Sequence, residues 1–142
     1  MNDNTYIATN KTTMTTKAKI QLEYSINCSP AVLYNRLSSA SGLSEWFADD
    51  VHVRGKVYTF IWEGSEQVAE MVQSRDGKHV RFNWINPEEE EDETYFEFRI
   101  NKDELTGDVS LVVTDFAEQG EEDEAIDLWN SQIADLRRVL GC

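Results

Sequence analysis

Histidine, the side chain that enzymes use most often for acid–base chemistry, occurs only twice in this chain. The two histidines, His52 and His79, are separated by the length of a hairpin and fall on the polar sides of their predicted strands. A histidine titrates near neutral pH and can serve as a catalytic base, but exposed surface histidines are commoner. The sequence therefore identifies no catalytic residue, and a binding function is favoured over catalysis.

Motifs that would indicate a particular reaction are missing as well. There is no glycine-rich phosphate loop, nucleophile elbow or HExxH helix. Cys28 and Cys142 have neither CxxC spacing nor a histidine cluster that would complete a zinc site. We expect two reduced cytosolic thiols, no metal and no cofactor. Phosphoryl transfer, serine hydrolysis and zinc proteolysis have no support from the sequence.

The most informative residues are aromatic and occupy alternate positions in neighbouring predicted strands. Alternate residues share one face of a sheet, so these rings can line a concave surface that helices close. Such walls bind hydrophobic ligands by removing apolar surface from water, at about 25 cal/mol per Å². Simple core packing is the alternative for any single residue, whereas cavity lining suits the group. The candidate ligand-binding residues are Trp46, Phe60, Trp62, Phe82, Trp84, Phe96, Phe98, Trp129 and Ile133.

Candidate polar contacts inside the same cavity are the side chains of Tyr24, Tyr58, Tyr95 and Arg81. Because strand alternation points successive side chains to opposite faces, only some of these four can face a cavity.

The elements that must position these residues begin with a strand. Residues 19–26 alternate strictly between apolar and polar side chains, which is typical of a half-buried strand. Ser29 and Pro30 then provide a cap and a first-turn proline for a short helix. Ser41 is the candidate cap of a second short helix, which we expect to end near Asp49.

From Val51 to Phe116 the hydrophobic period is two, and it predicts about six antiparallel strands. Asp76 and Gly77 stand between two of the runs and suit a tight hairpin turn. The last segment changes to spacings of three and four, which predicts a long amphipathic helix. The apolar stripe of that helix consists of Ile126, Trp129, Ile133, Leu136 and Leu140.

Size and composition indicate one domain. The chain has 142 residues with no internal repeat or linker, so we expect a flexible N-terminal tail at 1–16 and a single domain at 17–142. The formal charge of −14 repels phosphate backbones, which excludes nucleic acid as a favoured partner. Acidic runs at 88–93 and 118–124 are typical of solvated loops. No apolar stretch is long enough to enter a bilayer, so we expect a cytoplasmic protein.

The element order, combined with several local motifs, resembles the START-like (SRPBCC, birch-pollen-allergen) superfamily. The motifs are Ser29-Pro30, Leu43-Ser44-Glu45-Trp46-Phe47, Val80-Arg81-Phe82-Asn83-Trp84 and Leu128-Trp129. The resemblance implies an α+β helix-grip fold, in which a curved antiparallel sheet of about seven strands wraps around the C-terminal helix and two short helices follow the first strand. It also implies a cavity that many relatives use for lipids, sterols or polyketides. The nearest branch is related to activators of a heat-shock chaperone ATPase.

Three interpretations of function remain after this comparison. The favoured one is a binding domain for a small hydrophobic molecule. The second is a protein-interaction or co-chaperone-like module with a packed interior, acting on a protein partner or as a homodimer. The third is a cyclase, dehydratase or hydrolase that works inside the cavity, which requires a buried titratable group beside the ligand.

Overall fold

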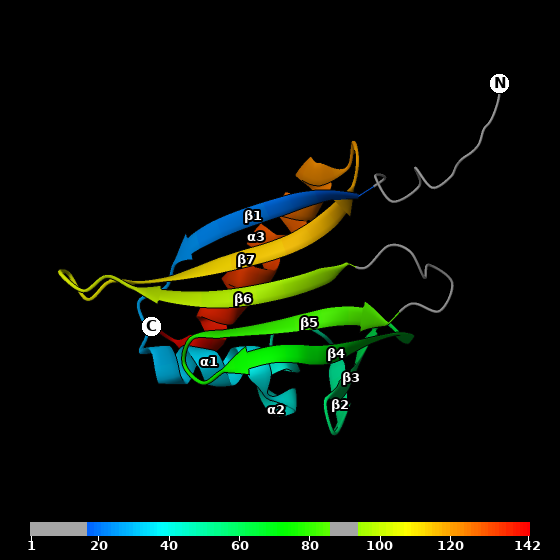
Figure 1. Ribbon diagram of the computed structural model, residues 1–142, viewed down its shortest axis with the longest axis horizontal. Coiled ribbons are helices and arrows are strands. Elements are labelled where there is room, and N and C mark those ends of the chain that lie inside the picture. The colour runs from blue at the N-terminus through cyan, green and yellow to red at the C-terminus, as the bar shows by residue number, and fades with distance from the viewer. Residues whose placement is uncertain (1–16, 86–93) are drawn as a thin grey trace.

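A seven-stranded antiparallel sheet and one long helix dominate the structure, a computed structural model that describes residues 17–85 and 94–142. The predicted tail at 1–16 and the acidic run at 88–93 lie outside the described residues. The strand order is β1-β7-β6-β5-β4-β3-β2, and α3 lies behind the sheet in Figure 1. The elements are β1 (Lys17–Ser25), α1 (Pro30–Ser38), α2 (Ala40–Leu43), β2 (Asp50–Arg54), β3 (Val57–Trp62), β4 (Ser65–Arg75), β5 (His79–Ile85), β6 (Tyr95–Lys102), β7 (Val109–Glu118) and α3 (Glu122–Leu140).

Strand pairing confirms the predicted antiparallel sheet and the hairpin at Asp76-Gly77. Gly77 has a φ of 74°, a left-handed conformation that glycine adopts without a steric penalty. Across the sheet, Phe82 pairs with Phe96, and Phe98 pairs with Val113. These apolar residues share the inner face, so the two-residue period places the large rings under α3.

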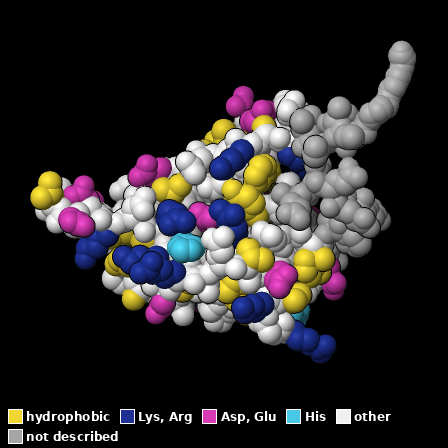
Figure 2. Space-filling model, in the orientation of Figure 1, with side chains coloured by type: hydrophobic (Ala, Val, Ile, Leu, Met, Phe, Trp, Pro, Cys, Tyr) yellow, Lys and Arg dark blue, Asp and Glu magenta, His cyan; other side chains and the backbone are white. Residues whose placement is uncertain are grey.

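The outer face of the sheet carries a compact ion-pair network. Arg81 and Arg99 both contact the carboxylate of Glu97, at 2.8 Å and 3.3 Å, although Glu97 is only 6% exposed. The guanidinium of Arg81 also lies 3.9 Å from the centre of the Tyr95 ring. Figure 2 shows Lys and Arg side chains gathered on this face. Tyr95 and Arg81 therefore point away from the interior.

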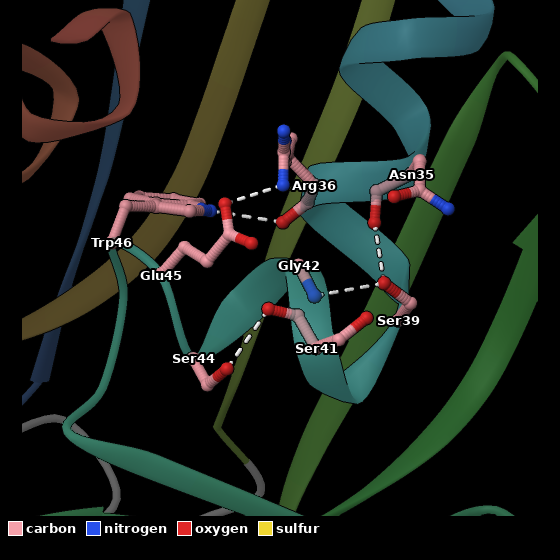
Figure 3. Close-up of polar contacts among 8 residues, drawn as sticks. All are labelled: Asn35, Arg36, Ser39, Ser41, Gly42, Ser44, Glu45 and Trp46. Atoms are coloured by element: carbon pink, nitrogen blue, oxygen red, sulfur yellow. Dashed lines mark hydrogen bonds and ion pairs between the residues drawn. The ribbon is translucent and has the colours of Figure 1, made fainter. Parts of the chain in front are cut away.

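The two short helices meet at Ser39, and here the predicted boundaries are wrong. Ser29 caps α1 as expected, but α2 is capped by Ser39 rather than Ser41 and ends at Leu43 rather than near Asp49. The hydroxyl of Ser39 accepts the Gly42 N–H at 2.9 Å and donates to the carbonyl of Asn35 at 2.8 Å (Figure 3). This pair of bonds turns the chain between the two helices.

Gly42 allows α1 and α2 to approach closely. A Cβ at this position would lie 2.4 Å from the Asn35 carbonyl oxygen and 2.7 Å from the Arg36 Cα. The close approach also brings Trp46 to α1, where its Nε1 donates to the carbonyl of Arg36 at 2.9 Å (Figure 3). A residue with no side chain is therefore needed where the second helix crosses the first.

The substitution Gly42→Ala should lower the free energy of unfolding by about 1–3 kcal/mol, because the added methyl group meets backbone atoms that cannot move aside independently. Urea denaturation measures the change. Ser41→Ala, at the exposed neighbouring position, is the matched control and should change stability by less than about 0.5 kcal/mol. Equal stability of the Gly42→Ala variant and the wild type would contradict the close packing.

The predicted stripe of α3 faces the sheet. Trp129, Ile133 and Leu136 are buried against the inner face, while Ile126 and Leu140 are partly buried at its margins. Burying such side chains contributes about 1.5–3 kcal/mol each. The helix ends at Gly141, which adopts a left-handed conformation with a φ of 71°.

The expectation of two reduced thiols is wrong for this structure. Cys28, in the loop before α1, and Cys142, after α3, form a disulfide with a Cα–Cα distance of 5.8 Å. The bond joins residues 114 positions apart and ties the end of α3 to the end of β1, where Arg137 also donates to the Ser25 carbonyl at 2.7 Å. Disulfides persist mainly in oxidising compartments. The cytoplasmic location therefore remains a prediction, and the disulfide does not support it.

Reduction of the disulfide should lower the free energy of unfolding by about 2–4 kcal/mol, because a cross-link that closes a long loop restricts the unfolded chain. Cys142→Ser should show the same loss without a reducing agent. Unfolding curves with and without dithiothreitol measure the effect. The Cys142→Ser variant should no longer respond to dithiothreitol, and a continued response would show that the reagent acts elsewhere.

Candidate ligand-binding cavity

A cavity of about 300 Å³ lies between the inner face of the sheet and the N-terminal half of α3. Aromatic rings form most of its wall, and two glutamines, one aspartate and one leucine complete it. The lining residues are Phe47, Trp62, Gln67, Trp84, Phe96, Asp115, Leu128, Trp129 and Gln132. Its volume is at the lower end of the range for small-molecule sites, about 300–1,000 Å³, and suits a ligand of one or two rings.

Phe47, in the turn after α2, forms the centre of the aromatic wall. Its ring lies 5.2 Å from that of Phe96, 5.3 Å from that of Trp62 and 5.8 Å from that of Trp129. Its carbonyl accepts hydrogen bonds from Trp62 Nε1 at 2.7 Å and from Gln132 Nε2 at 3.2 Å. The same residue therefore fixes lining side chains from β3 and from α3.

Asp115 is the one ionisable residue among the described residues that line the cavity. It continues the inward-facing alternation of Val109, Leu111 and Val113 along β7, and its Oδ2 accepts the Trp129 Nε1–H at 2.8 Å. Burial raises the pKa of Asp115 above the usual aspartate range, and this effect outweighs the lowering by hydrogen bonds from Trp129 and the Phe116 backbone and by the charge of Lys17. The cavity thus contains a carboxyl group that is costly to ionise.

The predicted ligand-binding residues divide into two groups. Trp62, Trp84, Phe96 and Trp129 line the cavity. The others, Trp46, Phe60, Phe82, Phe98 and Ile133, lie outside its lining and are buried in the core. They differ because the cavity occupies one end of the inner face, while rings in the middle of the sheet pack tightly, as shown by the 4.9 Å separation of the Phe82 and Phe96 rings.

Five further residues line the cavity that were not among the predicted ones: Phe47, Gln67, Asp115, Leu128 and Gln132. Strand alternation was a usable signal for two of them. Asp115 follows three inward apolar residues at the same period, and Gln67 precedes inward-facing Ala69. No periodic signal marks Leu128, which is 61% exposed at the edge of the cavity. Tyr24 and Tyr58 do face inward, but they bond to Asn130 and to the Ser38 carbonyl.

Within residues 17–85 and 94–142 no group of three or more His, Cys, Asp or Glu side chains is placed to hold a metal ion. Over the same residues, none of the helices combines the length and apolar character needed to cross a membrane.

A curved antiparallel sheet closed by a long C-terminal helix defines the helix-grip class of α+β domains, and the cavity described above lies at one end of the interior between them. Residues 14–142 match the family model described as the START-like superfamily domain. The chain therefore belongs to the START-like superfamily, which confirms the resemblance seen in its motifs.

Similar solved structures carry the same fold. Protein BfR322 from Bacteroides fragilis is 38% identical, with 87% of this chain and 91% of that chain covered and a TM-score of 0.62. The Aha1 dimer from Colwellia psychrerythraea is 19% identical, with coverages of 87% and 96% and a TM-score of 0.73. DynU16, described as a putative protein in the dynemicin biosynthetic locus, is 13% identical, with coverages of 87% and 47% and a TM-score of 0.70. No curated protein matches the chain.

The raised pKa of Asp115 makes stability depend on pH in a definite direction. Between the unfolded and folded pKa values the native state binds more protons than the unfolded state, so the free energy of unfolding falls as pH rises through this window. Asp115→Asn should remove that fall and be at least as stable as the wild type at pH 7. Thermal unfolding measured from acidic to neutral pH tests the prediction.

Asp103 provides a control of opposite sign. Hydrogen bonds from the Thr106 and Leu105 backbone N–H groups lower the pKa of this exposed carboxyl, so its contribution to stability increases as pH rises. Asp103→Asn should therefore be less stable than the wild type at pH 7 and similar to it in acid. Parallel changes in the two variants would contradict the burial of Asp115.

Proposed function

We propose that this protein binds a small hydrophobic molecule in the cavity between the sheet and α3. The observation that supports the proposal is the lining itself, in which aromatic rings from three strands, the turn after α2 and α3 surround about 300 Å³. Large apolar side chains form this wall, yet they do not fill the space between them. A ligand that filled the space would bury its own apolar surface at about 25 cal/mol per Å².

Membership of the START-like superfamily supports the same function, because the fold typically holds hydrophobic ligands between its sheet and C-terminal helix. The polar groups of the cavity are few and converge from different elements: Gln67 from β4, Asp115 from β7 and Gln132 from α3. A mostly apolar wall with a few fixed polar groups is the usual composition of a small-molecule site.

Titration with indole, a neutral aromatic probe, tests the proposal. The melting temperature should rise with indole concentration, because a ligand that binds only the native state stabilises it by RT ln(1 + [L]/Kd). In ¹H–¹⁵N spectra the indole N–H signals of Trp62 and Trp129 should shift on binding. The Trp46 signal is an internal control and should stay fixed, since Trp46 lies outside the cavity lining. Failure of indole and of a wider panel of lipids and metabolites to shift the melting temperature would contradict ligand binding.

Leu128→Ala should weaken indole binding about fivefold, which corresponds to about 1 kcal/mol for the loss of part of the apolar wall. Global stability should change little because Leu128 is 61% exposed. Leu105→Ala is the matched control: Leu105 is 95% exposed between β6 and β7, and it is not part of the lining. Equal affinities for the two variants would argue against binding at this cavity.

Catalysis inside the cavity is the second candidate function, and Asp115 is the observation that favours it. A buried carboxyl group with a raised pKa can hold a proton at a pH where an ordinary aspartate is ionised, and can transfer it to a bound ligand. The part of the lining that the structure describes offers no second titratable group to assist in proton transfer. The interaction-module alternative expects a packed interior, and the cavity gives it less support.

A further inference from the structure

We infer that the ligand of this cavity is an organic cation, an ammonium group attached to an apolar body of one or two rings. The inference rests on the proposed function and names the class of molecule that the lining would select. Two independent features point to it: the arrangement of aromatic rings around the space, and the charge of the groups that face it.

The aromatic rings favour a positive charge. Trp62, Trp84 and Trp129 line the cavity together with Phe47 and Phe96. The face of an aromatic ring carries partial negative charge, and indole attracts cations most strongly among the aromatic side chains. Several rings around one small space are the arrangement by which proteins recognise ammonium groups.

Asp115 can supply the opposite charge within the same wall, because a bound cation favours the ionised form of a carboxyl group that burial alone makes costly to ionise. A carboxylate can accept about four hydrogen bonds. The structure gives Asp115 the indole N–H of Trp129 and the backbone N–H of Phe116, so acceptor capacity remains for a ligand. The charge that acts on Asp115 from β1 is that of Lys17, which is paired with Glu118 at 2.7 Å. Among the described residues of the lining there is no Lys, Arg or His, so these residues offer an anionic ligand no charged partner.

The surroundings of the cavity favour a cation as well. The chain carries a formal charge of −14, and the first turn of α3, one turn before Leu128, contains Glu122, Asp123 and Glu124. The basic pair Arg81 and Arg99 lies on the outer face of the sheet, where Figure 2 shows Lys and Arg side chains, and not beside the cavity. The net charge and these carboxylates favour a negative potential near the cavity, and such a potential raises the local concentration of cations.

Three probes of nearly the same shape separate charge from hydrophobicity. Benzyltrimethylammonium is positive, neopentylbenzene is its uncharged carbon isostere, and phenylmethanesulfonate is a negative analogue with a tetrahedral head group. Affinities for the wild-type protein at 0.15 M salt, where exposed charges are screened beyond about 8 Å, should rank the cation above the neutral molecule and the neutral molecule above the anion. We expect the cation to bind about tenfold more tightly than its isostere.

Asp115→Asn should reduce the affinity for benzyltrimethylammonium about tenfold and change that for neopentylbenzene less than about twofold, because only the cation uses the charge. Asp115→Glu, which keeps the carboxylate, should retain the preference for the cation. Asp103→Asn removes one exposed carboxylate between β6 and β7, outside the lining, and is the control for net charge. It should leave all three affinities unchanged.

Nuclear Overhauser contacts in the wild-type complex locate the charge without any variant. The methyl protons of benzyltrimethylammonium should contact ring protons of Trp62, Trp84 or Trp129. Contacts only with residues outside the lining would overturn the inference, as would a neutral isostere that binds as tightly as the cation. If the neutral isostere bound as tightly as the cation, the proposed hydrophobic site would still be supported. If neither indole nor any of the three probes bound, both proposals would fail.

Discussion

The packing of Phe47 against the rings around it is the contact on which the inner face of this protein depends. Phe47 reaches Phe60 on β3, Phe96 on β6 and Trp129 on α3, so one side chain holds together elements that are far apart in the sequence. Its backbone carbonyl adds hydrogen bonds to two further lining residues. Because the close approach at Gly42 sets where this turn lies, the shape of the cavity follows from how the two short helices meet.

Much of the fold could be predicted because side-chain periodicity directly reflects the face that an element buries. Alternation marked the strands, and spacings of three and four marked α3. The second short helix was placed less well, since Ser39 and Ser41 are equally good capping residues and sequence alone does not say which one meets the Asn35 carbonyl. The apolar spacing of Leu43, Trp46 and Phe47 also fits a helix, although the chain leaves α2 at Leu43.

The site could be predicted only in part. Periodicity shows which face of the sheet a residue occupies, but it does not show which residues on that face pack against the helix and which border a cavity. Phe82 and Trp84 share one face of β5, yet only Trp84 lies where the packing leaves space. Asp115 lies on the inward face of β7 by the same alternation, but a charged residue is not expected on a buried face from sequence alone. The disulfide had no local signal at all, since its cysteines are 114 residues apart and come together only when α3 crosses the sheet.

The two ends of α3 are held in very different ways. Its C-terminal end has a covalent tether at Cys142, a left-handed glycine cap and a side-chain bond from Arg137 to β1. At its N-terminal end the capping residue Glu121 makes no side-chain capping hydrogen bond, although the acidic side chains of the first turn interact favourably with the helix dipole. Fraying of the first turns therefore costs less free energy than detachment of the last ones. These first turns, which follow β7 after a turn of three residues, are also the part of α3 that borders the cavity, so the least restrained section of the helix lies beside the aromatic wall.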